Sequence, residues 1–144
     1  MKKLIYIVAI FALHFLSCSD EIDSQINGFW QLKTIENNGV VNHVDTVFYG
    51  FQRGATFSIS VLLPDNSLVE SIYSYGYVSF PSENKMKISM DTARYEDGSF
   101  KVIRGDFLKY SEWGDYYITF DVKQLDNKHL IVSKDEKIFS FSRH

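Results

Sequence analysis

The sequence predicts an all-β protein: an antiparallel up-and-down β-barrel of about eight strands, preceded by an N-terminal signal helix. Two observations support the barrel. Short apolar segments recur between turn signals, and residues inside these segments alternate between apolar and polar. Aromatic residues make up 16% of the chain, and they favour strands over helices. A chain of 144 residues has room for one domain.

Eight turn signals divide the chain from Gly28 to His144 into nine strand-sized pieces. Gly, Asn and Asp are frequent in them because these residues adopt positive φ or hydrogen-bond to the nearby backbone. Short strands at regular spacing are typical of an antiparallel barrel or sandwich. The turn signals are Asn37–Gly39, Gln52–Gly54, Pro64–Asn66, Pro81–Asn84, Glu96–Gly98, Ser111–Asp115, Leu125–Asn127 and Lys134–Lys137.

Period-two alternation with one apolar face is the pattern of a half-buried strand. It predicts that three sets of side chains point inward: Phe57, Ile59, Val61 and Leu63; Met86, Ile88 and Met90; and Ile118, Phe120 and Val122. The segment 99–112 is ambiguous, because its apolar residues fall near helical spacing while Gly105 interrupts them. Strand, helix and loop all remain open there.

The first seventeen residues have the pattern of a secretion signal. A positive start, Met1–Lys3, is followed by an apolar run from Leu4 to Leu16 that only His14 breaks. As a helix this run would reach about 20 Å, which is short of the ~30 Å hydrocarbon core of a bilayer. We therefore expect a cleaved signal peptide over 1–17 rather than a spanning helix.

The signal ends in Phe15-Leu16-Ser17-Cys18, which resembles the lipobox of bacterial lipoproteins, although Phe15 stands where Leu is usual. The resemblance implies that Cys18 is lipidated on sulfur and becomes the mature N-terminus, so that the protein's first partner is a membrane. Cys18 is the single cysteine in the sequence, so no intramolecular disulfide can form.

An acidic stretch follows the cysteine, at Ser19, Asp20, Glu21 and Asp23. It resembles the export signal that sends lipoproteins of the Bacteroidota to the outer face of the outer membrane; the alternative is a solvated acidic linker. Residues 18–26 would then be a tether, and 27–144 the barrel domain. Removing residues 1–17 takes away two lysines and no acids, so the formal net charge falls from −3 to −5. This charge, without a basic stripe, argues against a nucleic-acid partner.

Both ends of the domain resemble the lipocalin pattern. Gly28-Phe29-Trp30 opens the first strand and Arg143 lies in the last, while Phe120–Val132 looks like the penultimate hairpin of lipocalin-like domains in bacterial surface lipoproteins. The resemblance implies that Trp30 plugs the closed end of the barrel and that Arg143 lies across its ring. Such a cation–π contact contributes about 0.5–2 kcal/mol.

Residues that would carry catalysis or hold a cofactor do not form a recognisable pattern. The sequence contains no Gly-x-Ser-x-Gly elbow and no glycine-rich phosphate loop. His43 and Asp45 could begin a metal site, but a third ligand at suitable spacing is missing. His129 is expected to be a packed or surface residue. The sequence thus predicts a protein that is not an enzyme and has neither cofactor nor metal.

Aromatic side chains are the candidate ligand-binding residues, because a tyrosine joins a large apolar body to a polar tip. One stripe alternates along a strand and a second group surrounds a loop; together they are Tyr73, Tyr75, Tyr77, Tyr110, Trp113, Tyr116 and Tyr117. The competing interpretation is that they are ordinary barrel-wall tyrosines. Two functions follow: a small apolar or amphipathic ligand held in the barrel mouth, or a filled barrel that recognises protein or glycan through loops such as Ser111–Tyr117.

Overall fold

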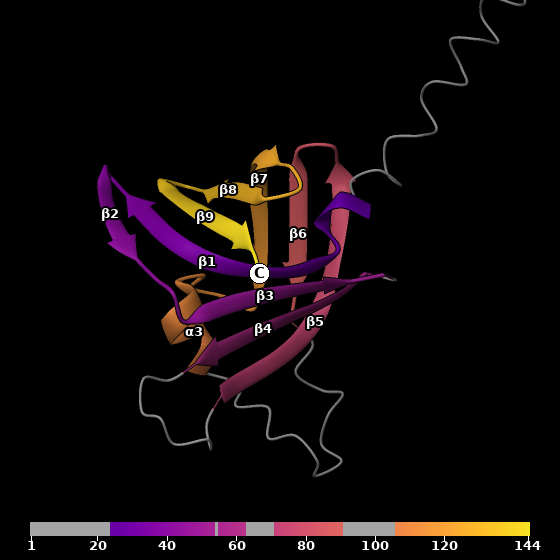
Figure 1. The fold of residues 1–144 in the computed structure, drawn as a ribbon, viewed down its shortest axis with the longest axis horizontal. Helices are drawn as coiled ribbons and strands as arrows, with labels where there is room; N and C mark the ends of the chain where they lie inside the picture. The colour runs from indigo at the N-terminus through magenta and orange to yellow at the C-terminus, as the bar shows by residue number, and fades with distance from the viewer. Residues whose placement is uncertain (1–23, 54, 63–70, 91–105) are drawn as a thin grey trace, which may run out of the picture.

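A computed structural model of the chain describes residues 24–53, 55–62, 71–90 and 106–144. These residues form nine strands and the short helix α3, and residues 24–26 just before β1 are also helical (Figure 1). The elements are β1 (Gly28–Asn37), β2 (Val40–His43), β3 (Val47–Gln52), β4 (Thr56–Leu62), β5 (Ser71–Ser82), β6 (Lys85–Ser89), α3 (Asp106–Ser111), β7 (Tyr117–Leu125), β8 (His129–Lys134) and β9 (Lys137–Arg143).

Several expectations fall on residues outside the described ranges. They are the signal peptide over 1–17, the lipidation site Cys18, and the export signal Ser19, Asp20, Glu21 and Asp23. The side chain of Tyr73 and the first part of segment 99–112 also lie outside.

All nine strands belong to one antiparallel sheet that closes on itself. Each neighbour in the order β1-β3-β4-β5-β6-β7-β8-β9 is hydrogen-bonded to the next, and β9 pairs with β1 to complete an eight-stranded barrel. The predicted fold class, an antiparallel barrel of about eight strands, is confirmed. β2 is an additional strand that pairs with the far half of β1, from Thr34 to Asn37.

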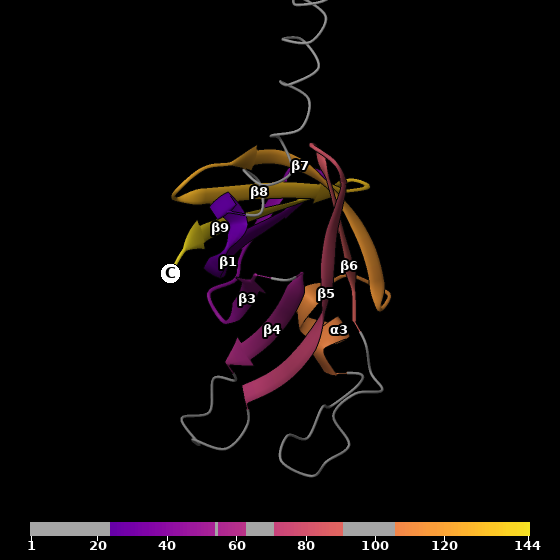
Figure 2. The same cartoon turned by 90° about the vertical axis from the view of Figure 1, so that its right-hand side faces the viewer.

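Two of the nine predicted pieces differ from the observed elements. The piece between the first two turn signals forms both β2 and β3, which lie one after the other along the same edge of β1. β1 advances by three residues between the pairs Thr34–His43 and Gln31–Phe48, whereas the segment opposite it advances by five. Two extra residues therefore separate β2 from β3. In the ambiguous segment 99–112, the described residues 106–111 form the helix α3, which packs against β4 and β5 (Figure 2).

The alternation in the sequence placed most of the expected core residues correctly; Leu63 lies outside the described residues, and Val122 is only half-buried. Phe57, Ile59 and Val61 are fully buried, as are Met86 and Ile88, and Met90 and Ile118 are nearly so. Large aromatic side chains complete the interior, since six of the largest fully buried residues carry rings: Trp30, Tyr49, Phe51, Phe57, Phe120 and Phe139. An eight-stranded barrel encloses just enough space for side chains or one small ligand, and here rings occupy much of it.

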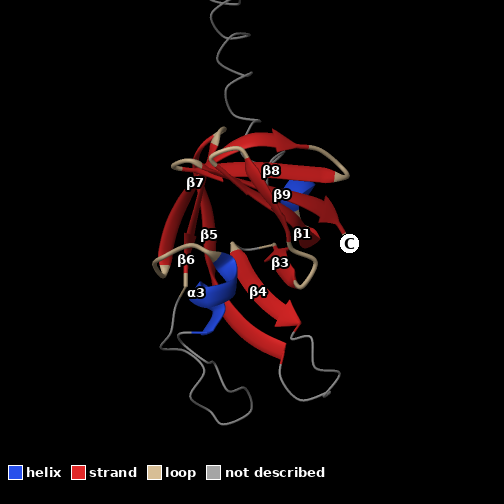
Figure 3. Ribbon diagram, turned by 90° about the vertical axis from the view of Figure 1, so that its left-hand side faces the viewer, coloured by secondary structure: helices blue, strands red, loops and turns tan. Residues whose placement is uncertain are grey.

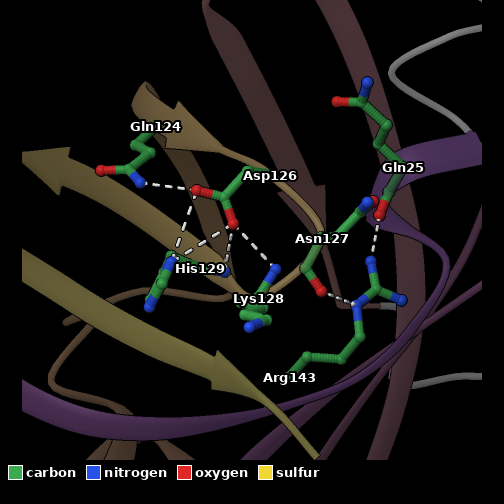
Figure 4. Close-up of polar contacts among 7 residues, drawn as sticks. All are labelled: Gln25, Gln124, Asp126, Asn127, Lys128, His129 and Arg143. Atoms are coloured by element: carbon green, nitrogen blue, oxygen red, sulfur yellow. Dashed lines mark hydrogen bonds and ion pairs between the residues drawn. The ribbon is translucent and has the colours of Figure 1, made fainter.

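At one end of the barrel, Arg143 holds both chain ends together. Its guanidinium carbon lies 4.4 Å from the centre of the Trp30 ring, and the two residues are direct partners in the β1–β9 pair. Its nitrogens donate to three backbone carbonyls. Figure 4 shows two of these bonds, from Nε to Asn127 at 2.9 Å and from Nη2 to Gln25. In the third, Nη1 donates to Asn27 at 2.7 Å. The planar five-donor guanidinium suits this task, because a single group can join three segments.

Glycine at position 28 is required by this contact. Gly28 has φ +128°, which side chains rarely adopt, and an added Cβ would lie 2.9 Å from Arg143 Nη1. The Gly-x-Trp motif therefore places a close backbone approach beside the ring that Arg143 covers. Trp30 is completely buried, and its Nε1 donates to the carbonyl of Ile26 at 2.7 Å.

The turn between β7 and β8 presents its Asn127 carbonyl to Arg143. Asp126 fixes this turn, since its carboxylate accepts from the amides of Lys128 and His129, each at 2.8 Å, and from Gln124 Nε2 at 2.7 Å (Figure 4). These donors, the Lys128 amide foremost, hold the pKa of the Asp126 carboxyl well below its usual range. The hairpin expected over Phe120–Val132 is present as β7–β8.

Replacing Trp30 by alanine should lower the free energy of unfolding by about 3–5 kcal/mol, because it empties a fully buried site at the barrel end. Chemical denaturation of the chain from Ser19 to His144 measures this. Phe29→Ala is the matched control: the adjacent ring is 49% exposed, so we expect a cost of about 1 kcal/mol or less. Equal losses in the two variants would show that Trp30 does not close the barrel.

Candidate functional site: a pocket at the barrel mouth

A pocket of about 430 Å³ lies at the end of the barrel opposite the Trp30–Arg143 contact. β1 runs from one end to the other, from Trp30 to Asn37. The residues that line the pocket come from the end of β1, the loop after α3 and the β8–β9 turn. Figure 3 shows the barrel from this side. The size of the pocket is within the usual range for small-molecule sites. Its lining residues are Asn37, Glu112, Trp113, Gly114, Lys134, Asp135, Glu136, Lys137 and Phe139.

Trp113 forms the floor of this pocket. It follows α3 directly, and the residues on either side of it both have positive φ: Glu112 at 56° and Gly114 at 79°. This backbone turns the indole into the barrel, where it is 4% exposed. There its ring centre lies 5.7 Å from those of Tyr49 and Phe57.

A buried hydrogen bond fixes the floor from below. Trp113 Nε1 donates to the hydroxyl oxygen of Tyr49 at 2.6 Å. Tyr49 is completely buried, and this burial raises the pKa of its phenol far above the usual value; the bond from Trp113 opposes the shift only in part. The phenol is therefore neutral at physiological pH, and each polar tip satisfies the other inside an aromatic core.

The rim of the pocket is polar and comes from three adjacent strands. Asn37 is the direct partner of Lys137, and Lys137 is the direct partner of Lys134. Residues in register across antiparallel strands share a face, so these three side chains lie in one row. The row continues the inward-facing positions below it, because Lys137 is two residues from the buried Phe139 and Lys134 is two residues from the buried Val132.

An ion pair closes one side of the rim. Lys137 Nζ lies 2.9 Å from Glu112 Oε2 and 3.5 Å from the Glu112 carbonyl oxygen. It thereby fastens the loop that carries Trp113 to β9. Lys134 Nζ lies 3.1 Å from the carboxylate of its neighbour Asp135.

The tyrosine stripe expected to face a ligand lies on the outer side of the barrel. Phe57 and Ile59 point inward and pair with Gly76 and Ser74, both buried, so the residues between them on β5 face outward. Tyr75 is half-buried and Tyr77 is 41% exposed. The expectation that this stripe lines the barrel mouth is therefore wrong for Tyr75 and Tyr77, since period two puts alternate residues on opposite faces.

The second aromatic group is divided by the fold. Trp113 lines the pocket, whereas Tyr117 is 63% exposed on β7. Tyr110 is half-buried on α3, with Lys109 Nζ 5.6 Å from its ring centre, and Tyr116 is half-buried before β7. The loop Ser111–Tyr117 was expected to be an exposed recognition loop, and this is wrong for Ser111 and Trp113, because both are buried in the barrel end.

Sequence reasoning missed the rim lysines and Tyr49. Lys134 and Lys137 belong to the turn signal Lys134–Lys137, which predicts turn residues and no inward-facing side chain. The available signal was parity: counting by twos from Leu130 and from Phe141 places both lysines on the inward face. Tyr49 had the same signal, since it lies two residues from each of Val47 and Phe51, which are buried on the same face of β3.

Of the pair His43 and Asp45, which could begin a metal site, Asp45 has another partner. Asp45 Oδ1 accepts from Lys33 Nζ at 2.8 Å, and His43 ends the exposed strand β2. Within the residues that the structure describes, no group of three His, Cys, Asp or Glu could hold a metal ion. In the same part of the chain, no helix has the length and apolarity that a membrane crossing requires.

Comparison with known proteins agrees with the closed barrel. A family model described as a lipocalin-like domain matches residues 11–144. The chain therefore belongs to the lipocalin-like domain family. Among curated proteins, none matches this chain.

Two solved structures share the fold. A lipocalin-like protein from Bacteroides uniformis is 24% identical with a TM-score of 0.68, and an uncharacterized protein from Bacteroides eggerthii is 23% identical with a TM-score of 0.65. Each match covers 83% of this chain and 99% of the other.

Removing the hydroxyl of Tyr49 should destabilise the barrel end. Tyr49→Phe leaves Trp113 Nε1 buried without its acceptor, which costs about 1–3 kcal/mol of unfolding free energy. Chemical denaturation gives this difference. Tyr117→Phe removes a hydroxyl from an exposed ring and should change stability by less than about 0.5 kcal/mol. If the two variants are equally stable, the bond does not fix the floor.

The burial of Tyr49 also predicts that the stability of the protein falls at alkaline pH, and Tyr49→Phe tests this. Folding raises the pKa of the Tyr49 phenol. Below about pH 10 the phenol is therefore protonated in both the folded and the unfolded protein, and its titration takes nothing from the free energy of unfolding. Above this pH the unfolded state releases its proton first, and stability falls by up to about 1.4 kcal/mol per pH unit. Wild type should thus lose stability between about pH 10 and 12 faster than Tyr49→Phe. Parallel pH profiles would contradict the burial of this phenol.

Proposed function

We propose that this protein is a membrane-anchored, non-catalytic binding protein that holds a small apolar or amphipathic molecule in the mouth pocket. The observation that carries the proposal is the pocket itself. It combines the rings of Trp113 and Phe139 with a rim of polar and charged side chains, namely Asn37, Glu112, Lys134, Asp135, Glu136 and Lys137. Small-molecule sites are concave and combine apolar or aromatic side chains with placed polar groups, and this pocket contains both kinds. Lipocalin-like barrels typically bind ligands rather than catalyse reactions, which agrees with this assignment.

The proposed binding position is the mouth and not the barrel interior. Rings in mutual contact run through the interior: Tyr49 lies 4.6 Å from Phe141 and 5.2 Å from Phe57, centre to centre, and Phe120 lies 5.3 Å from Phe139. A ligand inside the barrel would have to displace these rings. A ligand in the mouth rests against Trp113 without disturbing them.

The anchor is the second part of the proposal. The lipobox-like Phe15-Leu16-Ser17-Cys18 supports lipidation at Cys18, and the acidic residues after it support outer-membrane placement, with the cell surface favoured over the periplasmic face. Two or three acyl chains would hold the protein stably, whereas one chain binds a membrane only marginally.

One alternative has an observation in its favour. Tyr77 and Tyr117 are exposed on the outer face of neighbouring strands, where Ser89 on β6 pairs with both. Exposed tyrosines on a barrel with a filled core suit recognition of a protein or glycan by the outer surface. In that case the mouth pocket would hold no ligand.

Native mass spectrometry of the chain from Ser19 to His144, purified from its own host without detergent, separates the two functions. The proposal predicts a stoichiometric added mass that leaves on denaturation and is absent after Trp113→Ala. A clean mass for the wild-type chain would favour recognition by the outer surface.

The anchor has its own test. Cys18→Ser should abolish acylation, so that the protein is found soluble or remains unprocessed, because no thiol is present to carry lipid. Cell fractionation and metabolic labelling with a fatty acid measure both effects. Ser19→Ala is the matched control and should stay acylated in the membrane fraction. Unchanged processing and membrane retention of Cys18→Ser would refute the lipobox assignment.

A further inference from the structure

The segment that leads into β1 is fastened to the closed end of the barrel, which the Trp30–Arg143 contact seals. Ile26 is buried there, and its carbonyl accepts from Trp30 Nε1 at 2.7 Å. Arg143 donates to the carbonyls on either side of it, those of Gln25 and Asn27. From Gln25 onward, the chain therefore has a fixed position at this end.

Only a short tether separates the closed end from the proposed anchor. Six steps along the chain lead from Cys18 to Ser24, where the described part of the structure begins. Because an extended chain covers at most about 3.3–3.6 Å per residue, these steps span at most about 20 Å. An acylated Cys18 lies at the level of the lipid headgroups. Ser24 therefore stays within about 20 Å of the bilayer surface.

The mouth lies farther from the closed end than the tether can reach. β1 advances from Gly28 to Asn37, which is about 30 Å at about 3.3 Å per residue. Barrel strands tilt by about 35–45°, so the distance along the axis is about 23 Å. The β8–β9 turn extends beyond this level, since Asn37 pairs with Lys137, the first residue of β9. If the mouth faced the bilayer, even a fully extended tether would be too short.

The surface of the closed end is polar. Three turns of the described chain form it: those between β3 and β4, between β5 and β6, and between β7 and β8. They expose charged side chains of both signs, among them Arg53, Glu83, Lys85 and Lys128. Burying such groups in hydrocarbon would cost free energy, whereas lipid headgroups offer them ionic and hydrogen-bond partners. This end therefore suits contact with headgroups and not insertion into the bilayer core.

Large exposed apolar side chains of the described residues lie mostly toward the mouth. Val40 and Val41 are 62% and 51% exposed on β2, which pairs with the mouth half of β1. Leu62 is 51% exposed at the mouth end of β4. These side chains would enter the bilayer if the mouth faced it. The tether keeps them away from the membrane that carries the anchor.

We infer that the closed end is the membrane-facing surface of this protein, in contact with lipid headgroups, and that the mouth opens away from the bilayer. The inference rests on the anchor in the proposed function, because an acylated Cys18 fixes the start of the tether. A small molecule for the mouth pocket then arrives through the aqueous medium and not directly from the lipid of the same bilayer.

Fluorescent labels at the two ends test this orientation. Because the single cysteine of the sequence, Cys18, carries lipid in the anchored protein, a second cysteine can be labelled alone with bimane. Glu83→Cys places the label at the closed end, in the β5–β6 turn, and Glu136→Cys places it at the mouth, in the β8–β9 turn. The two variants are matched, since each replaces one exposed glutamate in a turn. Each acylated variant is reconstituted into phosphatidylcholine vesicles that contain a lipid with a nitroxide on its headgroup, which quenches bimane at short range.

We expect the nitroxide lipid to quench the Glu83→Cys label at least about threefold more than the Glu136→Cys label, because the two ends lie about 23 Å apart along the axis. Vesicles without nitroxide give the unquenched intensity of each label. A melting temperature shows that each variant is folded. Lys128→Cys at the closed end and Asp135→Cys at the mouth repeat the comparison if either glutamate variant is unfolded.

A longer tether tests the cause of the orientation. Twelve Gly and Ser residues inserted after Asp23 raise the maximum reach to about 60 Å, which exceeds the length of the barrel. The difference in quenching between the two labels should then largely disappear. A difference that survives the insertion would overturn the tether as the cause of the orientation.

The outcomes separate the orientation from the anchor. Equal quenching at both ends, or stronger quenching at the mouth, would overturn the orientation while the anchor stands. If mass spectrometry of the membrane-extracted protein finds no acyl chain on Cys18, the anchor and the orientation are both overturned. Small-molecule binding in the mouth would remain, since its own test uses the chain without lipid.

Discussion

The contact on which the structure depends most is the stack of Arg143 on Trp30. A barrel closes only when its first and last strands meet, and here the two residues that meet are separated by almost the whole domain. The guanidinium covers the Trp30 ring at 4.4 Å and also holds the carbonyls of Gln25, Asn27 and Asn127. One planar group joins the end of β9 to the segment before β1 and to the β7–β8 turn. The same contacts therefore close the sheet and seal this end of the barrel.

Sealing one end moves any binding to the other end, and the aromatic core restricts it further. Eight strands enclose little space, and rings from Tyr49, Phe57, Phe120 and Phe139 occupy it. Trp113 completes this packing from the loop after α3 and has its polar tip bonded to Tyr49. What remains for a small molecule is the space above Trp113. There the strands end, and polar side chains can reach solvent without the cost of burial. The fold thus accounts for a shallow site with an apolar floor and a charged rim.

Much of the architecture could be predicted from local pattern. Alternation identified the inward faces of β4 and β6, because period two in a strand assigns each side chain to a face. The split of β2 from β3 could not be predicted, since it arises from two extra residues opposite β1, and a register is a property of two segments. The helix α3 was ambiguous for a related reason. Its apolar residues pack against β4 and β5, and this requirement for apolar residues does not by itself specify a helix.

The sequence alone determined the fold class and the inward faces of most strands, because these follow from residue type and spacing. The Trp30–Arg143 pairing was implied by the lipocalin resemblance. The tertiary structure decided which side chains could meet a ligand. It put Tyr75 and Tyr77 on the outer wall, buried Trp113, and brought Asn37, Lys134 and Lys137 into one row at the mouth. A site formed by three strands and a loop depends on closure of the barrel and on the register between its strands. Neither can be derived from the sequence of a single segment.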